Sequence, residues 1–148
     1  MKTYTIQAFE TSLEQALDAI SDQSEGLRSC VEPILNGVER NFQSSQSARG
    51  DSWPARKDPG DGHPLLIDTG DLMTSAIGAG TVVQVGATEM SIDLPPGQSG
   101  TSRGGVRRHE FGGGGIPARP YFGVSEETAD ECVKRIADNV MDQLAAIG

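Results

Sequence analysis

The sequence lacks an apolar run long enough to span a lipid bilayer, which takes about 20 residues in a helix. Its N-terminal stretch carries one lysine and no apolar segment, so we expect no secretory signal. Positive charge is also scarce, because 12 Lys and Arg face 21 Asp and Glu and leave a net charge of −9. This balance argues against a general binder of nucleic acid or of anionic membranes, since phosphate-rich partners attract lysine and arginine.

Cysteine is nearly absent. Only Cys30 and Cys132 occur, and both fall at apolar positions of helix-like segments. Such positions are typical of small buried thiols, which are inert, and a disulfide between them is the less favoured alternative. Their separation along the chain also excludes a zinc knuckle.

The residues that are present suit one globular domain spanning residues 1–148. Apolar residues make up 36%, and the 19 glycines raise this to about half, the usual fraction for a globular chain. Glycine together with the 8 prolines is concentrated in the middle of the chain, where it predicts long loops.

Hydrophobic periodicity predicts the elements of the N-terminal part. Alternation over residues 3–9 predicts a short strand, and helical spacing follows over 9–20. We expect Gly26 to break this first helix. A second helical stripe over 27–42 contains Pro33, so this helix either begins close to that proline or is kinked by it.

The rest of the chain predicts strands followed by a helix. The expected elements are a loop at 44–63 pinned by Trp53, a helical turn at 68–73, strands at 82–85 and 90–94 around a turn at 86–89, a loop at 95–117, and a helix capped by Ser125. This order favours an α+β fold over a doubly wound parallel sheet. We expect a small antiparallel β-sheet packed against the N-terminal helices and a long C-terminal helix.

No stretch has the pattern of a catalytic, cofactor or metal site. Gly112 to Gly115 is followed by Ile116-Pro117 and not by a helix start with lysine, so it lacks the context of a phosphate loop. The acids near His63 lack the spacing of a calcium loop. Serines crowd the loops, which do not hold a nucleophile rigidly. We therefore expect no enzyme, no cofactor and no metal.

Positive charge is concentrated in residues 101–119, which hold four arginines and one acid, a formal charge of +3, while the rest of the chain carries −12. Three interpretations are open: a solvated loop, an element that docks on the acidic face of a neighbouring subunit, or a DNA-binding arm. Arginine without interleaved aromatic residues offers bases no stacking platform, which disfavours the third. The arginines are Arg103, Arg107, Arg108 and Arg119.

Three stretches carry a recognisable pattern. They are Phe42 followed by Gly50-Asp51-Ser52-Trp53-Pro54; Leu65-Leu66-Ile67-Asp68-Thr69-Gly70-Asp71-Leu72-Met73-Thr74-Ser75; and His109-Glu110-Phe111-Gly112 followed by Ile116-Pro117-Ala118-Arg119-Pro120-Tyr121-Phe122-Gly123. In this order they resemble the tail-completion, or virion morphogenesis, family of tailed bacteriophages, over most of residues 42–148. Two features depart from the family: Glu110 stands where a glutamine is usual, and the stretch before His109 is longer and looser.

The resemblance implies a structural, non-enzymatic virion protein made in the host cytoplasm. It implies a ring, a hexamer, at the head-proximal end of the tail, which completes or terminates the tail and joins it to the neck. The implied partners are further copies of itself, tail tube or sheath proteins, and neck or connector proteins, with DNA passing through the ring but not bound specifically. The alternatives are a neck or head-closure protein or an assembly factor, and then a small enzyme.

Two sets of residues follow as candidates. The proposed subunit interface is Arg103, Arg107, Arg108, His109 and Arg119. The motif residues expected to shape the fold are Trp53, Asp68, Thr69, Gly70, Leu72, Phe111, Gly112, Pro117, Pro120, Phe122 and Gly123. Around a channel, an acidic lining would keep DNA sliding, and the candidates are Glu10, Glu14 and Asp18 or Glu127, Asp130 and Glu131. The alternative is that these acids only keep the protein dispersed in solution.

Overall fold

The computed structural model describes residues 6–57, 62, 64–67, 70–78, 81–93 and 105–147, with Ile6, Phe9, Ala19 and residues 105–107 described by their backbone alone. These ranges contain helices and one β-hairpin. In chain order they are α1 (Ile6–Ser21), α2 (Ser24–Ser29), α3 (Val31–Ser44), α4 (Asp71–Ile77), β1 (Val82–Val85), β2 (Met90–Asp93), α5 (Gly105–Phe111) and α6 (Glu126–Ile147).

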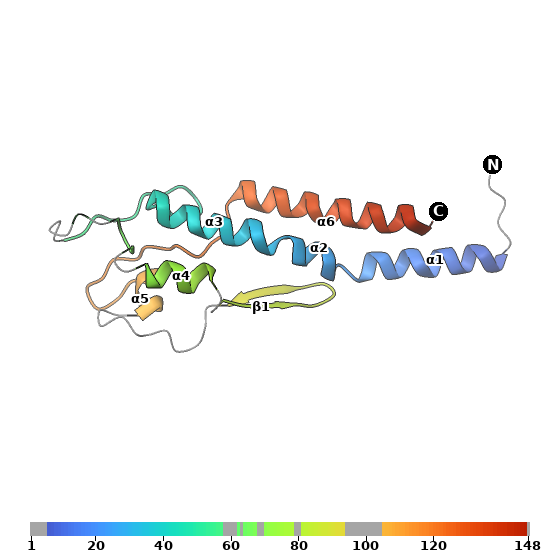
Figure 1. Cartoon of the computed structure of the whole chain (residues 1–148), viewed down its shortest axis with the longest axis horizontal. Coiled ribbons are helices and arrows are strands. Elements are labelled where there is room, and N and C mark those ends of the chain that lie inside the picture. The colour runs from blue at the N-terminus through green and yellow to red at the C-terminus, as the bar shows by residue number, and fades with distance from the viewer. Residues whose placement is uncertain are drawn as a thin grey trace.

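The subunit is elongated. Figure 1 shows α1, α2 and α3 following one another along the long axis, while α6 runs back beside α2 and reaches the C-terminal part of α1. The N-terminal part of α1 therefore projects beyond the end of α6. At the opposite end of the molecule, α4 packs against α3, and α5 lies close to α4 in the view of Figure 1.

The β-hairpin confirms the predicted strands and the turn between them. β1 pairs antiparallel with β2, with Val82 opposite Asp93. The Gln23 backbone N–H donates to the Ala87 carbonyl at 2.7 Å and so ties the turn to the start of α2. With this sheet, the N-terminal helices and the long α6, the structure confirms the α+β class.

The strand predicted at residues 3–9 is wrong where the chain is described, because α1 begins at Ile6. Residues 1–5 lie outside the described chain. The alternation that suggested a strand is short, and Ile6, Phe9 and Leu13 also recur at helical spacing. That spacing continues over a helix of 16 residues, so it outweighs the local alternation.

The predicted role of Gly26 as a helix breaker is also wrong. The break falls just before α2, where the Asp22 carboxylate accepts the Ser24 backbone N–H at 3.0 Å, a hydrogen bond that lowers the pKa of Asp22. Gly26 is buried inside α2, and a Cβ there would lie 3.3 Å from the Ile136 Cα of α6. Gly26 therefore allows α2 and α6 to pack closely.

The start of α3 decides whether Pro33 lies near the beginning of its helix or kinks it. α3 begins at Val31, so Pro33 is in its first turn and does not kink it. A backbone N–H in the first turn has no partner within the helix, so the donor that proline lacks is not missed.

The loop predicted at 95–117 contains a helix, which is a further correction. α5 covers Gly105–Phe111, and residues 94–104 lie outside the described chain. Gly112 ends the helix with φ +77°, and its N–H donates to the Arg108 carbonyl at 2.8 Å. A glycine directly after a turn with basic residues is a helix C-terminus signal, and it was present in the sequence.

The long final helix is confirmed, together with its cap. The Ser125 Oγ accepts the Thr128 backbone N–H at 3.2 Å. Its apolar residues do not all face other helices, however. Cys132 is half-buried, whereas Val133 and Met141 are 67% and 65% exposed.

The main core lies at the α3 end of the molecule. Its buried members are Val38, Phe42, Trp53, Ala76 and Tyr121, and half-buried side chains from residues 65–77 pack against them. Within the described ranges, no helix is both long and apolar enough to cross a membrane.

Candidate functional site

Two of the three motif stretches meet in one aromatic cluster, and half-buried side chains of the third pack against it. Phe42, at the C-terminal part of α3, lies edge-on to the Trp53 ring, with centroids 5.9 Å apart. On its other side the Tyr121 ring lies 4.9 Å away in a tilted arrangement. All three side chains are buried, so residues far apart in sequence form one hydrophobic unit.

Hydrogen bonds fix this cluster to the backbone. The Trp53 indole N–H donates to the Pro120 carbonyl at 3.0 Å, which satisfies the one polar atom of the buried ring. The Asn41 side-chain amide donates to the Tyr121 carbonyl at 2.9 Å. The loop after α3 is therefore pinned at Trp53, as predicted. Asn41 carries no sequence signal and was missed.

Arg119 connects two of the motif stretches inside the subunit. Its Nε donates to the Pro54 carbonyl at 2.9 Å, and its Nη2 donates to the Ala55 carbonyl at 3.1 Å. The residue is only 7% exposed, and burial lowers the pKa of its guanidinium, with Arg56 adding to the effect. Arg119 was expected at the subunit interface, but the structure uses it as a cross-link within one subunit.

Glu110 holds α5 against the same segment. One carboxylate oxygen accepts the backbone N–H groups of Tyr121 and Phe122, at 2.9 and 3.2 Å. Both bonds need only an acceptor oxygen, which a glutamine side chain also supplies. The departure from the family's glutamine therefore preserves the hydrogen-bonding geometry.

His109 lies between α5 and the arginine cross-link. Its carbonyl accepts the Arg119 backbone N–H at 2.7 Å. Burial lowers the pKa of the imidazole, and the positive charge of Arg119 lowers it further. Its Nδ1 is buried, with no hydrogen-bond partner among the described residues. The His109 side chain is therefore partly buried inside the molecule and partly exposed at its surface.

Several motif glycines occupy places that a side chain would disturb. Gly70 precedes α4 and Gly112 follows α5, both with positive φ, at +82° and +77°. A Cβ on Gly112 would lie 3.0 Å from the Ala118 backbone N, and one on Gly123 would lie 3.0 Å from the Ala48 Cβ. These positions hold the chain in its path.

The other motif residues are divided between core and surface. Leu72 and Phe122 pack against the core cluster, Pro117 is half-buried and Pro120 offers its carbonyl to Trp53. Phe111, in contrast, is 72% exposed. Asp68 and Thr69 lie outside the described residues.

The basic segment does not act as one surface. Arg108 is exposed on α5, whereas Arg119 is buried and His109 is half-buried. Arg103 lies outside the described residues, as does the side chain of Arg107. Of the proposed interface set, Arg108 is the described side chain that remains available to another molecule.

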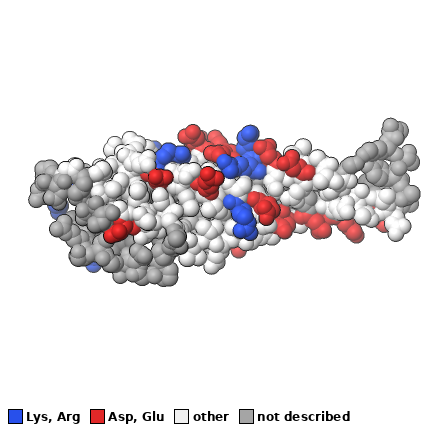
Figure 2. All heavy atoms as spheres, viewed as in Figure 1, with Lys and Arg blue, Asp and Glu red and all other residues white. Residues whose placement is uncertain are grey.

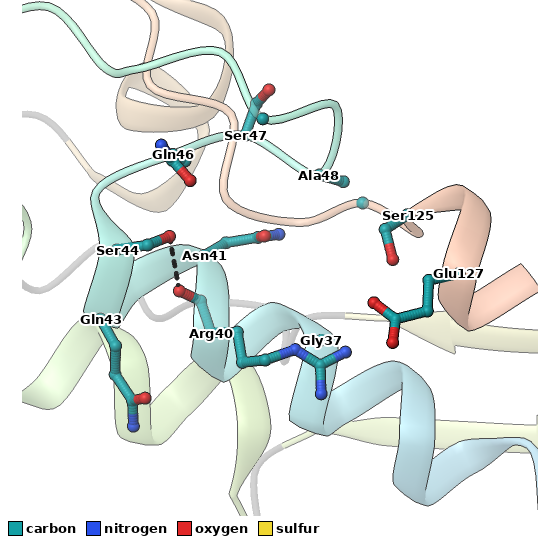
Figure 3. Close-up of a pocket in the computed structure, with 12 residues that line it drawn as sticks. Gly37, Arg40, Asn41, Gln43, Ser44, Gln46, Ser47, Ala48, Ser125 and Glu127 are labelled. Carbon is teal, nitrogen blue, oxygen red and sulfur yellow. Dashed lines mark hydrogen bonds between the residues drawn. The ribbon is translucent and has the colours of Figure 1, made fainter.

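A polar groove of about 510 Å³ lies between α3, the loop that follows it and the start of α6. Figure 3 shows the side chains of Arg40 and Glu127 extending into this space. The Arg40 Nη2 donates to the Thr128 Oγ1 at 3.3 Å. Among the described residues, neither histidine nor cysteine lines the groove, and its Ser47 hydroxyl donates to the Asp51 carboxylate at 3.5 Å, the limit of hydrogen-bonding distance.

Groups of metal-ligating residues are also lacking in the described part of the chain. No three His, Cys, Asp or Glu side chains there come together in a way that would hold an ion. Cys30 is buried and Cys132 half-buried, and both are free thiols. Burial and a hydrogen bond with Cys30 raise the pKa of Cys132 to about 11, which keeps this thiol protonated and unreactive near neutral pH.

Comparison with known proteins gives one family. The sequence model of the phage virion morphogenesis family matches residues 4–144, nearly the whole chain. Searches of curated proteins and of solved structures gave no match. The match extends beyond the motif stretches to α1 and α6. The chain therefore belongs to the phage virion morphogenesis family.

Proposed function

We propose that this protein is a structural component of the head-proximal end of a phage tail. Identical subunits, six by resemblance to tail-completion proteins, form a ring that completes or terminates the tail and joins it to the neck. Family membership establishes the coarser part, a role in building the phage particle. The ring and its position are the proposal.

One observation supports the finer proposal. The motif residues are used inside the subunit, where Trp53, Glu110 and Arg119 hydrogen-bond to backbone groups more than ten residues away. They build a scaffold. Exposed apolar and charged side chains remain at the ends of an elongated molecule, as subunits that assemble with one another need.

Loss of the protein from a phage that encodes it tests this role. Electron microscopy of the lysate should show DNA-filled heads and unjoined tails, with tails of irregular length, and the wild-type gene supplied in trans should restore joined particles. Tails of normal length beside heads that have lost their DNA would favour a head-closure role. Wild-type protein that stays monomeric by native mass, both alone and with purified tail tubes, would contradict the ring.

The channel of such a ring has a candidate lining. Glu127, Asp130 and Glu131 are exposed in the first half of α6, and Figure 2 shows acidic side chains gathered along the helices. An acidic lumen repels the phosphate backbone, so DNA slides through and is not gripped. Charge reversal of these three acids to lysine should make assembled rings retain duplex DNA near physiological salt, whereas reversal at exposed Glu25 should not.

A further inference from the structure

The projecting helix α1 has an apolar face that the described part of the chain leaves about half exposed. Leu13, Leu17 and Ile20 are 49%, 58% and 56% exposed and lie on one side of the helix. Among the described side chains of α1, Ser12 and Ala16 are half-buried, and Ala16 lies within one helical turn of both Leu13 and Ile20, at the edge of this stripe. An amphipathic helix in a monomer normally buries its apolar stripe, so this face is built to meet another molecule.

Negative charge borders this apolar stripe. Glu10, Glu14 and Asp18 recur every four residues, so they form one row along α1 next to the leucines. α1 contains neither lysine nor arginine. A partner for this face therefore needs an apolar anchor and positive charge next to it.

The α5 end of the molecule has those two properties. Phe111 is 72% exposed, the largest exposed fraction among the large apolar side chains that the structure describes, and Arg108 is exposed one helical turn before it. Lys57 adds a second cation, since its Nζ lies 4.0 Å from where a Cβ on Gly115 would be. An aromatic ring bordered by cations thus complements leucines bordered by acids.

The two surfaces cannot meet within one subunit. Figure 1 places α1 at one end of the long axis and α5 toward the other, with α2 and α3 between them. A contact between them must join two copies head to tail. A row of copies joined by this heterologous contact has one unused α1 face and one unused α5 end. Both are used only when the row closes into a ring.

We infer that the α1 face formed by Leu13, Leu17, Ile20 and the row of acids is the docking site for the α5 end of the next copy of this chain. Phe111 of one copy packs on the leucines of its neighbour, and Arg108 faces the acids around Glu14. This inference rests on the proposed ring and names the surfaces that form it.

Two variants of the full chain separate the two halves of the contact. The α1 variant is Leu13→Gln with Leu17→Gln, and the α5 variant is Phe111→Ser with Arg108→Glu. Val133→Gln is the matched control, because Val133 is an apolar residue on α6 that, at 67%, is more exposed than either leucine. Circular dichroism and the urea midpoint check that each variant is folded.

Native mass spectrometry of the variants alone and mixed gives the decisive result. Each variant alone should associate at least about tenfold more weakly than wild type, and the control should associate normally. An equimolar mixture should form heterodimers and no rings, since it contains one intact kind of junction, between the wild-type α1 of one variant and the wild-type α5 of the other. The charge swap Glu14→Arg with Arg108→Glu in one chain should restore part of the association that either change alone removes.

Other outcomes overturn the inference. Normal association of the α1 variant shows that this face is not in the ring, and dimers of the α5 variant alone show that α1 pairs with α1. If the wild-type protein forms rings and both variants form them as well, these two surfaces are not the contact between copies. The proposed function is then unaffected. Wild-type protein that assembles neither by itself nor on tail tubes contradicts the proposed function. If it assembles only on tail tubes, the association of wild type, the two variants and the control is measured on tail tubes.

Discussion

The two ends of this subunit are held together in different ways. At the α3 end, Trp53, Asn41 and Arg119 bind backbone groups 64 to 80 residues away, and three aromatic rings are buried together. At the α1 end, the helix lies against α6 but leaves its leucines about half exposed. The comparison indicates that stability is concentrated at the α3 end, whereas the α1 end leaves apolar surface uncovered.

This division suits a protein that must fold before it assembles. The motif end is held by its own chain, because the Trp53 indole, the Arg119 guanidinium and the backbone N–H groups of Tyr121 and Phe122 find hydrogen-bond acceptors within it. The α1 end remains amphipathic, and in the proposed ring a second copy covers it. Substitutions that affect one property and spare the other test the comparison most directly.

The largest effect on stability is expected from Phe42→Ala. This side chain is fully buried between Trp53 and Tyr121, so its removal leaves a cavity and should lower the free energy of unfolding by about 3–5 kcal/mol. The same substitution at exposed Phe111 should change it by less than about 0.5 kcal/mol. Urea unfolding followed by circular dichroism measures both, and equal losses would break the comparison.

A smaller effect is expected at Glu110. Glu110→Ala leaves the backbone N–H groups of Tyr121 and Phe122 without their acceptor and should cost about 1–3 kcal/mol of unfolding free energy. Glu110→Gln keeps an acceptor oxygen in place and should cost clearly less. If the two variants were equally destabilised, the charge of Glu110 would matter more than its hydrogen bonds.

The sequence predicted this scaffold in part. Long periodic stripes identified α1, α3 and α6, and the alternation around residues 86–89 identified the hairpin. Short elements failed: α5 was hidden among glycines, and a few alternating residues imitated a strand where α1 begins. Local pattern over fewer than about eight residues does not separate helix from strand, and neighbours in space decide.

The site could be predicted as a set of motifs but not as a geometry. The sequence indicated that Trp53 anchors a loop, yet it did not show that Arg119 is buried against Pro54 and Ala55. Charge alone placed all four arginines in one surface, because sequence does not reveal which cation finds acceptors inside the subunit. The exposed face of α1 was missed for the same reason, since an apolar stripe does not show whether another helix covers it.

We also expect the motif end to make the free energy of unfolding depend on pH. Burial and Arg119 lower the pKa of His109 below its usual value of 6.5, so the folded state binds this proton less readily than the unfolded state does. The contribution of neutral His109 to the free energy of unfolding is complete above about pH 6.5. It is lost as the pH falls through the pKa of His109 in the folded state. His109→Gln should therefore flatten the decline of the urea midpoint between neutral pH and about pH 5. A slope unchanged by His109→Gln would contradict the assignment.

The smallest effect on stability is expected at Leu17, and it sharpens the comparison most. Leu17 is 58% exposed, and leucine and glutamine have similar helix propensities, so Leu17→Gln should change the free energy of unfolding by less than about 0.5 kcal/mol. If α1 is a docking face, the same substitution weakens association, and its effect on native mass appears without a change in the urea midpoint. A loss of stability comparable to that of a buried leucine, about 2–5 kcal/mol, would mean that the monomer already buries this side chain in solution. The two ends would then not differ in the way that the exposed leucines indicate.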